Sequence, residues 1–246
     1  MRDDAPCCDS TVSGEALPDS RLVPPAPPLA SYIDANAESF HIRLAGSAGE
    51  RDASGRLVRK MYGWRGYAIE RSAADTGALT LLAEWRGLVV GTIGVCLDGA
   101  AGLPADDNFR DALDLLRAQG RGLAEPSRLA IDAGMSKRVF ASMIHVSYLY
   151  AHVLHGYSDY VIEVNPRHLG FYQRMLGFEQ MGPVRQCARV GAPAVLLRLP
   201  LASMGAQIRA CGGRPELQSR ERSLYPFFFA PADEAGISER LLAQLN

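Results

Sequence analysis

Several features that would restrict this 246-residue sequence to a particular class of protein are missing from it. No apolar run approaches the roughly 20 residues that a membrane-spanning helix needs. The first residues, MRDDAPCCDS, are acidic and lack the apolar centre of a secretory signal peptide. We therefore expect a cytoplasmic protein without a membrane span.

Cysteine patterns typical of metal sites and an excess of one charge are also absent. The five cysteines form no Cys-x-x-Cys pair and no cluster with histidine, so neither a disulfide framework nor a zinc site is expected. His145, His152 and His155 share one predicted helix, but no carboxylate or cysteine accompanies them at ligand spacing, and we expect no metal. The net charge of −1 gives no reason to expect nucleic-acid binding.

The composition along the chain predicts one domain with two appendages. Residues 1–30 are expected to form a disordered arm, because the proline-rich stretch at 24–28 cannot pair into a sheet. Residues 31–200 alternate between strand and helix patterns and should form the body of the protein. Residues 201–246 hold two further helical patterns around an apolar cluster at 225–229, which needs cover from the body or from a second copy of the chain. A homodimer through this extension is therefore possible.

Hydrophobic periodicity within the body predicts a mixed sheet flanked by helices. The strand at 122–132 contains Pro126. Proline within a strand is expected only at a bulge or on an edge strand. Residues 46–53 are expected to form a polar turn before a basic helix. The predicted strands lie at 40–44, 79–84, 88–95, 122–132, 161–164 and 194–199, and the predicted helices at 56–67, 109–119 and 135–155.

The stretch VIEVNPRHLGFYQRMLGF, residues 161–178, is the most informative one. A β-branched strand ends at Asn165-Pro166, a helical pattern follows, and Gly177 stands where a helix C-terminal cap is expected. Any strand–helix unit of an α/β protein would account for this order. The stretch also resembles the last motif of the GCN5-related N-acetyltransferase (GNAT) superfamily, in which a strand splays from its neighbour and the next helix closes over an acyl thioester. The resemblance implies an α/β fold with a mixed, mostly antiparallel sheet and a splay between two central strands.

Glu125 is the leading candidate for a general base if the chain acylates amines. An ammonium group has no lone pair, so a base must remove its proton before it attacks a thioester. A bulge at Pro126 is expected to expose Glu125, and Ser127 lies on the same face of the strand. An ion pair of Glu125 with Arg128 on an edge strand explains the same spacing equally well.

Residues 125–132, EPSRLAID, resemble the Glu-x-Ser-Arg strand of acyl-homoserine lactone synthases and of the long-chain N-acyl amino acid synthases. The second group matches better. The further blocks that resemble it are 102–119, which begins GLPAD, 147–151, 164–168, 171–172, 176–178 and 190–197. The resemblance implies transfer of a fatty acyl group from acyl carrier protein to the amino group of an amino acid.

The same resemblance implies the roles of the site residues. Glu125, Ser127 and Arg128 would be catalytic. Tyr172 stands where many superfamily members place the acid that protonates the departing thiolate, but its spacing to Gly177 is one residue longer than usual, and core packing explains it as well.

No bound cofactor is expected; the co-substrate would be the acyl-phosphopantetheine of acyl carrier protein. The superfamily's Q/R-x-x-G-x-G/A pyrophosphate loop is replaced by AGMSKR at 133–138, with a single glycine. Lys137 and Arg138 are candidates for the phosphate or for the acidic carrier. Asn165 and Arg167 are candidates for the pantetheine amides or, for Arg167, the substrate carboxylate, and Ile131 is grouped with them.

Two other kinds of function fit parts of the sequence. One is a related enzyme, either an acyl-homoserine lactone synthase or a coenzyme A-dependent N-acetyltransferase. Lactone synthesis is disfavoured because the N-terminal third lacks a convincing run of the tryptophan, aspartate and arginine residues that those enzymes use. The other is a non-catalytic module that binds acyl carrier protein or lipid, and the presence of Glu125 disfavours it. The sequence names neither the amino acid nor the chain length, because pockets built from distant residues set both.

Overall fold

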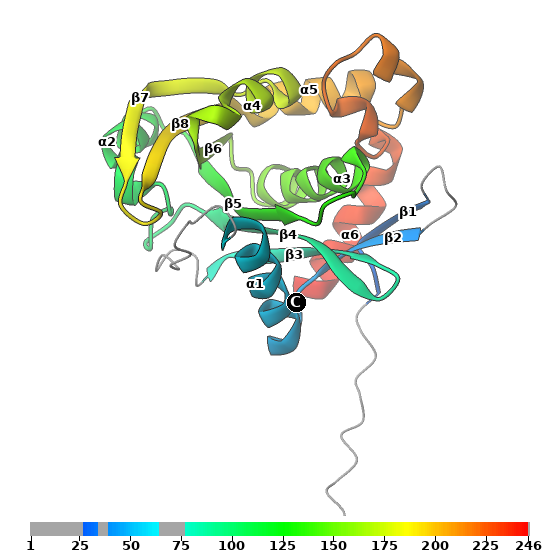
Figure 1. Cartoon of the computed structure of the whole chain (residues 1–246). Helices are drawn as coiled ribbons and strands as arrows, with labels where there is room; N and C mark the ends of the chain where they lie inside the picture. The colour runs from blue at the N-terminus through cyan, green and yellow to red at the C-terminus, as the bar shows by residue number, and fades with distance from the viewer. Residues whose placement is uncertain (1–26, 34–38, 64–76, 246) are drawn as a thin grey trace, which may run out of the picture.

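The computed structural model describes residues 27–33, 39–63 and 77–245 (Figure 1). In these ranges one sheet of eight strands has the order β1-β2-β3-β4-β5-β6-β8-β7. Every neighbouring pair is antiparallel except β5 and β6, which run parallel. The expected mixed, mostly antiparallel sheet is confirmed. The strands are β1 Ala30–Ile33, β2 Ser39–Leu44, β3 Leu79–Trp85, β4 Leu88–Leu97, β5 Leu123–Ile131, β6 Asp159–Val164, β7 Glu179–Cys187 and β8 Ala192–Pro200.

Helices cover both faces of this sheet. The helices α1 and α2 pack on one face, where Val58 shares a buried cluster with Ala130, and Phe109 shares another with Val161. The helix α3 lies on the other face (Figure 1), where the largest core cluster includes residues of α4, α5 and α6. The helices are α1 Ala48–Gly63, α2 Asp106–Ala118, α3 Lys137–Tyr148 with a π-helical continuation Leu149–Leu154, α4 Leu169–Leu176, α5 Leu201–Cys211 and α6 Glu234–Leu245, and short 3-10 turns lie at Pro166–His168, Pro215–Ser219, Tyr225–Phe227 and Pro231–Asp233. None of these helices is both long and apolar enough to cross a membrane.

The first helix begins earlier than the sequence pattern predicts. Residues 48–53 are helical, so the expected polar turn at 46–53 is wrong. The cause is a capping box: Ser47 Oγ accepts a hydrogen bond from Glu50 N–H at 3.2 Å, and the Glu50 carboxylate accepts from Ser47 N–H at 2.9 Å. The predicted end of this helix at residue 67 lies outside the described residues.

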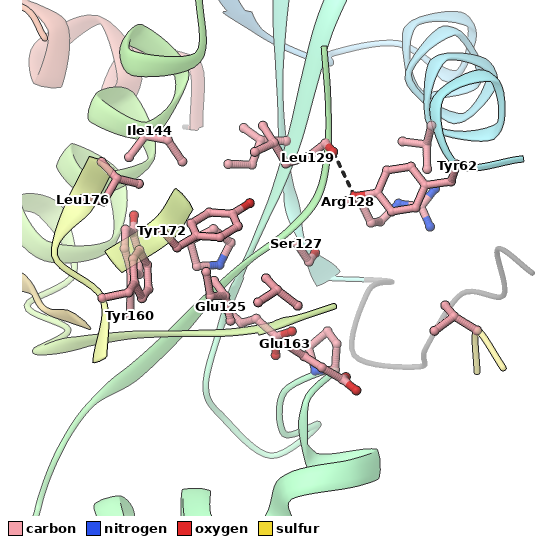
Figure 2. Close-up of a pocket in the computed structure, with 18 of the residues that line it drawn as sticks. Tyr62, Glu125, Ser127, Arg128, Leu129, Ile144, Tyr160, Glu163, Tyr172 and Leu176 are labelled. Carbon is pink, nitrogen blue, oxygen red and sulfur yellow. Dashed lines mark hydrogen bonds between the residues drawn. The ribbon is translucent and has the colours of Figure 1, made fainter. Parts of the chain in front are cut away.

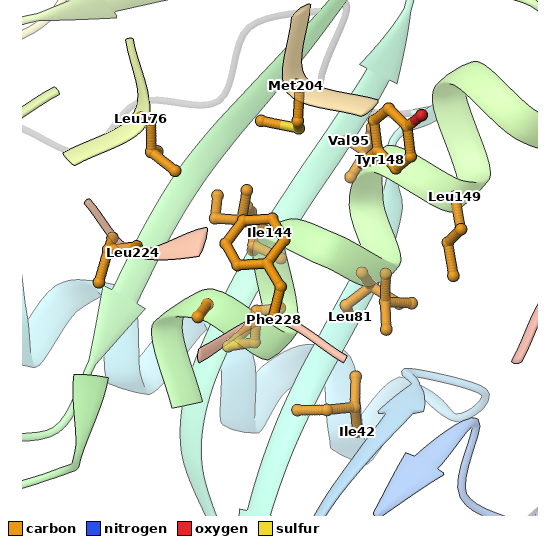
Figure 3. Close-up of a cluster of buried hydrophobic side chains, with 14 of the residues drawn as sticks. Ile42, Leu81, Val95, Ile144, Tyr148, Leu149, Leu176, Met204, Leu224 and Phe228 are labelled. Atoms are coloured by element: carbon orange, nitrogen blue, oxygen red, sulfur yellow. The ribbon is translucent and has the colours of Figure 1, made fainter. Parts of the chain in front are cut away.

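The two ends of the described chain pack on the same body. Leu29 and Ala30 are buried, and Leu29 N–H donates a hydrogen bond to Ile42 O at 2.7 Å. The predicted boundary of the arm at residue 30 is therefore wrong, because these two residues belong to the folded body. The rest of that arm, residues 1–26, lies outside the described residues. At the other end, the cluster at 225–229 is covered by the body: Phe228 lies among core side chains that include Ile144 and Leu224 (Figure 3). Fully buried His145 holds this segment, because its Nδ1 accepts from Phe229 N–H and its Nε2 donates to Glu234, both at 3.1 Å.

The predicted splay is present between β5 and β6. These strands pair only at Leu123 with Asp159 and at Ala124 with Tyr160, and the rest of β5 then has no ladder partner on that side. Asp159, in the first of these two pairs, is fully buried. Its carboxylate accepts hydrogen bonds from Arg121 Nε at 2.5 Å, Arg198 Nε at 2.8 Å and Ser158 Oγ at 2.6 Å. A charged network therefore anchors the base of the splay.

This network predicts a specific dependence of stability on pH. Burial alone would raise the pKa of Asp159, but hydrogen bonds from Arg121, Ser158 and Arg198 lower it overall. A carboxyl group whose pKa is lower in the folded state stabilises the fold above its unfolded pKa of about 3.9, and loses that contribution as the pH falls through the folded pKa. We expect Asp159→Asn to lower the free energy of unfolding by about 3 kcal/mol at pH 7 and to flatten its fall below about pH 4. Urea denaturation across pH measures both.

A matched control is Asp114→Asn, since the Asp114 side chain is 57% exposed and pairs with Arg117 on the same helix. Its effect should stay within about 0.5 kcal/mol. Equal effects of the two substitutions at pH 7 would contradict the role given to Asp159.

Candidate active site

A cavity opens where β5 and β6 diverge (Figure 2). Its inner part has a volume of about 180 Å³ and is bounded by Val58 and Tyr62 of α1 on one face of the sheet and by Ile144 of α3 and Leu176 of α4 on the other. An outer part of about 470 Å³ adjoins it. The two parts share several lining residues, namely Tyr62, Leu129, Glu163, Val164, Tyr172, Arg189 and Val190. The splay thus gives a passage between the two faces of the sheet.

Glu125 lines the inner cavity, but not in the way the sequence predicts. It is only 3% exposed, and its Oε2 accepts a hydrogen bond from Ala105 N–H at 2.8 Å. Pro126 pairs in register with Val95, and the irregularity lies further on. The prediction of a bulge at Pro126 that exposes Glu125 to solvent is therefore wrong. Pro126 is tolerated in this interior strand because β6 has already separated from β5, so no hydrogen bond to β6 is required of it.

The bulge lies at Arg128. This residue has a φ of 51°, and the β4 register shifts between Thr92 and Gly94, so that Arg128 and Leu129 lie opposite a single β4 residue. The shift turns both Ser127 and Arg128 towards the inner cavity, whose lining includes them. Figure 2 shows the Arg128 side chain beside Tyr62 of α1. Because β5 lies inside the sheet, the alternative reading of an edge strand is wrong.

The GLPAD block at 102–106 builds the hydrogen-bond donor for Glu125. Gly102 has a φ of 71°, and a Cβ atom there would lie 2.6 Å from Asp106 Oδ2, so only glycine fits. Asp106 accepts hydrogen bonds from Leu103 N–H and from Arg117, each at 2.7 Å. Burial alone would raise the pKa of Asp106, but these hydrogen bonds lower it overall, which keeps the carboxylate charged. The loop is thereby fixed with Ala105 N–H facing β5.

A second carboxylate faces the same turn from the other strand. Glu163 of β6 accepts a hydrogen bond from Asn108 Nδ2 at 3.1 Å and one from Arg189 Nη2 at 2.6 Å, and its side chain is 6% exposed. Figure 2 shows Glu125 and Glu163 at the same end of the cavity. The first turn of α2 therefore holds one carboxylate from each diverging strand, where the positive end of the helix dipole favours negative charge.

Sequence reasoning missed Glu163 and Arg189. A lone acid within the apolar strand 161–164 was a signal for Glu163, because an unpaired buried carboxylate is costly and implies a partner. Arg189 had no signal, since it lies between β7 and β8 and only the folded chain brings it to Glu163.

Tyr172 of α4 lines both parts of the cavity. Its ring makes edge contacts with Phe171 and Phe178 at centroid distances of 5.3 and 5.7 Å. Burial raises the pKa of Tyr172, so the hydroxyl group keeps its proton at neutral pH. The side chain is thus packed against other aromatic rings, and it lines the cavity with its hydroxyl proton retained.

The remaining predicted residues separate into two places. Ile131, Asn165 and Arg167 line the outer cavity. Lys137 is the first residue of α3 and is exposed. It lies on the same side of the helix as Phe140, three residues later, and Phe140 lines the outer cavity. Arg138 does not join them, because successive helical residues point about 100° apart. Its guanidinium group lies 4.9 Å from the ring centroid of Tyr32, in a different cavity. The grouping of Arg138 with Lys137 is therefore wrong.

A splay between parallel neighbours in a mostly antiparallel sheet, closed by a helix after the second of them, is the architecture of GNAT-fold acyltransferases. Within this class, the family described as N-acyl amino acid synthase FeeM matches residues 53–200. The structure of FeeM, an N-acyl amino acid synthase from uncultured soil microbes, is 32% identical and superposes with a TM-score of 0.64, covering 70% of this chain and 96% of that chain. The chain therefore belongs to the FeeM family of N-acyl amino acid synthases.

Two more distant structures are also similar. The acyl-homoserine lactone synthase LasI is 16% identical with a TM-score of 0.47 over 66% of this chain and 90% of its own. An acyl-CoA N-acyltransferase from Pseudomonas aeruginosa is 13% identical with a TM-score of 0.47 over 65% of this chain and 98% of its own. No curated protein sequence matches the chain.

Proposed function

We propose that this chain transfers a long-chain fatty acyl group from the phosphopantetheine of acyl carrier protein to the amino group of an amino acid. The observation that carries the proposal is the inner cavity, which passes between β5 and β6 and is lined by Glu125. A thioester and an amine can enter such a passage separately and meet beside the carboxylate. Membership of the FeeM family supports the same reaction class.

The walls of the cavity suit a fatty acyl thioester. Ile93, Ile144, Ile162, Leu176 and Phe178 form an apolar wall of the inner part. The inner and outer parts together reach the size typical of small-molecule sites, a few hundred Å³. An acyl chain there would be removed from water, which favours longer chains by about 0.8 kcal/mol for each buried methylene group.

The outer cavity suits a pantetheine arm with one phosphate. Asn165 and Arg167 supply polar groups, while exposed Lys137 lies at the start of α3, where helix N–H groups favour an anion. Residues 133–138 contain a single glycine, so they lack the pattern that cradles the pyrophosphate of coenzyme A. We therefore assign the donor as acyl carrier protein, with acyl-phosphopantetheine as co-substrate and no bound cofactor.

The chemistry follows from these positions. Glu125 accepts a proton from the ammonium group of the amino acid, and the freed amine attacks the thioester carbonyl carbon. The tetrahedral intermediate then collapses: the C–N bond remains, the C–S bond breaks, and the thiolate leaves. Tyr172, protonated at neutral pH, donates a proton to the thiolate, and the excess proton on the new C–N nitrogen passes to the resulting phenolate, which restores Tyr172. Glu125 then releases the first proton to solvent. The products are an N-acyl amino acid and the thiol of the carrier.

The base assignment predicts the effect of Glu125→Gln. The amide keeps the shape of the side chain but cannot accept the proton, so kcat should fall by about 10²- to 10⁴-fold. The wild-type pH–rate profile should show an acid limb that this variant lacks. Steady-state turnover with acyl carrier protein as donor measures both. Glu179→Gln, at an exposed position of β7, is the matched control and should leave turnover unchanged. Wild-type turnover by Glu125→Gln at every pH would rule out the assignment.

The donor assignment predicts a preference between two forms of the same acyl group. With equal chain length, kcat/KM should be at least about tenfold higher for acyl carrier protein than for coenzyme A, because charged contacts act at the carrier surface. Lys137→Ala should reduce this ratio, whereas Arg138→Ala, which faces the other cavity, should not. Equal or faster reaction with acyl-coenzyme A would overturn the assignment and favour a coenzyme A-dependent enzyme.

A further inference from the structure

Arg189 is placed to bind a second anion beside the base. One nitrogen, Nη2, donates to Glu163, and the closest approach to Asp107 is 3.6 Å at Nε. In the described part of the chain, this Nε atom is buried without a hydrogen-bond partner. A guanidinium group has five N–H donors, so Arg189 retains donors while it holds Glu163.

Arg189 also lies within electrostatic reach of Glu125. Burial alone would lower the pKa of Arg189, but Glu163, Cys187 and Glu125 raise it overall, so the guanidinium group stays charged. Arg189 and Glu125 line the same inner cavity. With Glu163, they form a largely buried cluster of two carboxyl groups and one guanidinium group, which exposed Asp107 of α2 also approaches.

The shape of an α-amino acid restricts where its carboxylate can bind. Only one carbon atom separates the amino nitrogen from the carboxylate carbon. When the amine lies at Glu125, the carboxylate must therefore meet a cation that lines the same part of the cavity. Arg167 lines only the outer part and is exposed. Arg128 lines the inner part on the α1 side, beside Tyr62, whereas Arg189 is hydrogen-bonded to Glu163, which lies at the same end of the cavity as Glu125 (Figure 2).

We propose that Arg189 binds the α-carboxylate of the acceptor amino acid, while Glu163 holds the guanidinium group in position. This inference rests on the proposed function and assigns the carboxylate to Arg189 instead of Arg167. The zwitterion then places its ammonium group at Glu125 and its carboxylate at Arg189, so each charge meets the opposite one inside a cavity that excludes most water. Acceptors without an α-carboxylate lack this contact.

The test compares a free amino acid with its carboxamide, which has the same amine and side chain but no carboxylate. Wild-type enzyme, with acyl carrier protein as donor, should prefer the amino acid by at least about tenfold in kcat/KM, since a hydrogen-bonded charge pair is lost with the amide. The double variant Arg189→Gln/Glu163→Gln avoids leaving a lone buried charge. It should raise KM for the amino acid and abolish the preference for the amino acid over the carboxamide.

Two further variants make the result specific. Arg189→Lys keeps the charge but loses the planar fork, so its preference should fall between wild type and the double variant. Arg214→Gln, at an exposed position outside the cavity, should leave both substrates unaffected. An unchanged preference in the double variant, or an equal loss on both acceptors, would overturn the role of Arg189 and leave the proposed reaction standing. A wild-type enzyme that acylates neither acceptor would instead overturn the proposed reaction itself.

Discussion

The hydrogen bond from Ala105 N–H to Glu125 is the interaction on which this site depends. Once β5 and β6 diverge, no ladder hydrogen bonds join them. The first turn of α2 connects the two strands instead. Ala105 N–H binds Glu125 of β5, and Asn108 binds Glu163 of β6. The same contacts give two buried carboxyl groups hydrogen-bond partners inside the protein, where an unpartnered polar group is costly. An opening in the sheet is thus held at a fixed width and lined with acid groups.

The surrounding structure supports that turn from several directions. Gly102 and Asp106 fix the loop before α2, and Arg117 fixes Asp106. Asp159 closes the other end of the splay with its own charged network. These contacts contribute to stability, but their placement also serves the chemistry that we propose, since a general base must be held near its substrate at a defined position. Within the GLPAD block, backbone geometry explains Gly102, and the ion pair with Arg117 explains Asp106.

Features of the fold that depend only on neighbouring residues, such as strand ends and helix caps, are predictable from the sequence. Asn165-Pro166 and Gly177 mark the strand end and the helix cap of the splay motif, and α4 ends as predicted, with Gly177 at a φ of 82°. The element that carries Glu125 was also predictable, whereas its burial was not, because Ala105 lies 20 residues away in the chain and reaches it only by folding. Lys137 and Arg138 are adjacent in sequence but face different cavities, and Arg189 meets Glu163 across 26 residues. Such pairings depend on the packing of whole elements, which periodicity does not encode.

If an acyl thioester and an amino acid meet in the splay, the products that the chain makes in a living cell test this most directly. Lipids extracted from a bacterial host that expresses the chain should be analysed by mass spectrometry beside lipids from the same host without it. We expect a new N-acyl amino acid with a long acyl chain. An acyl-homoserine lactone in its place, or a lipid profile that is unchanged while the folded protein accumulates, would contradict it.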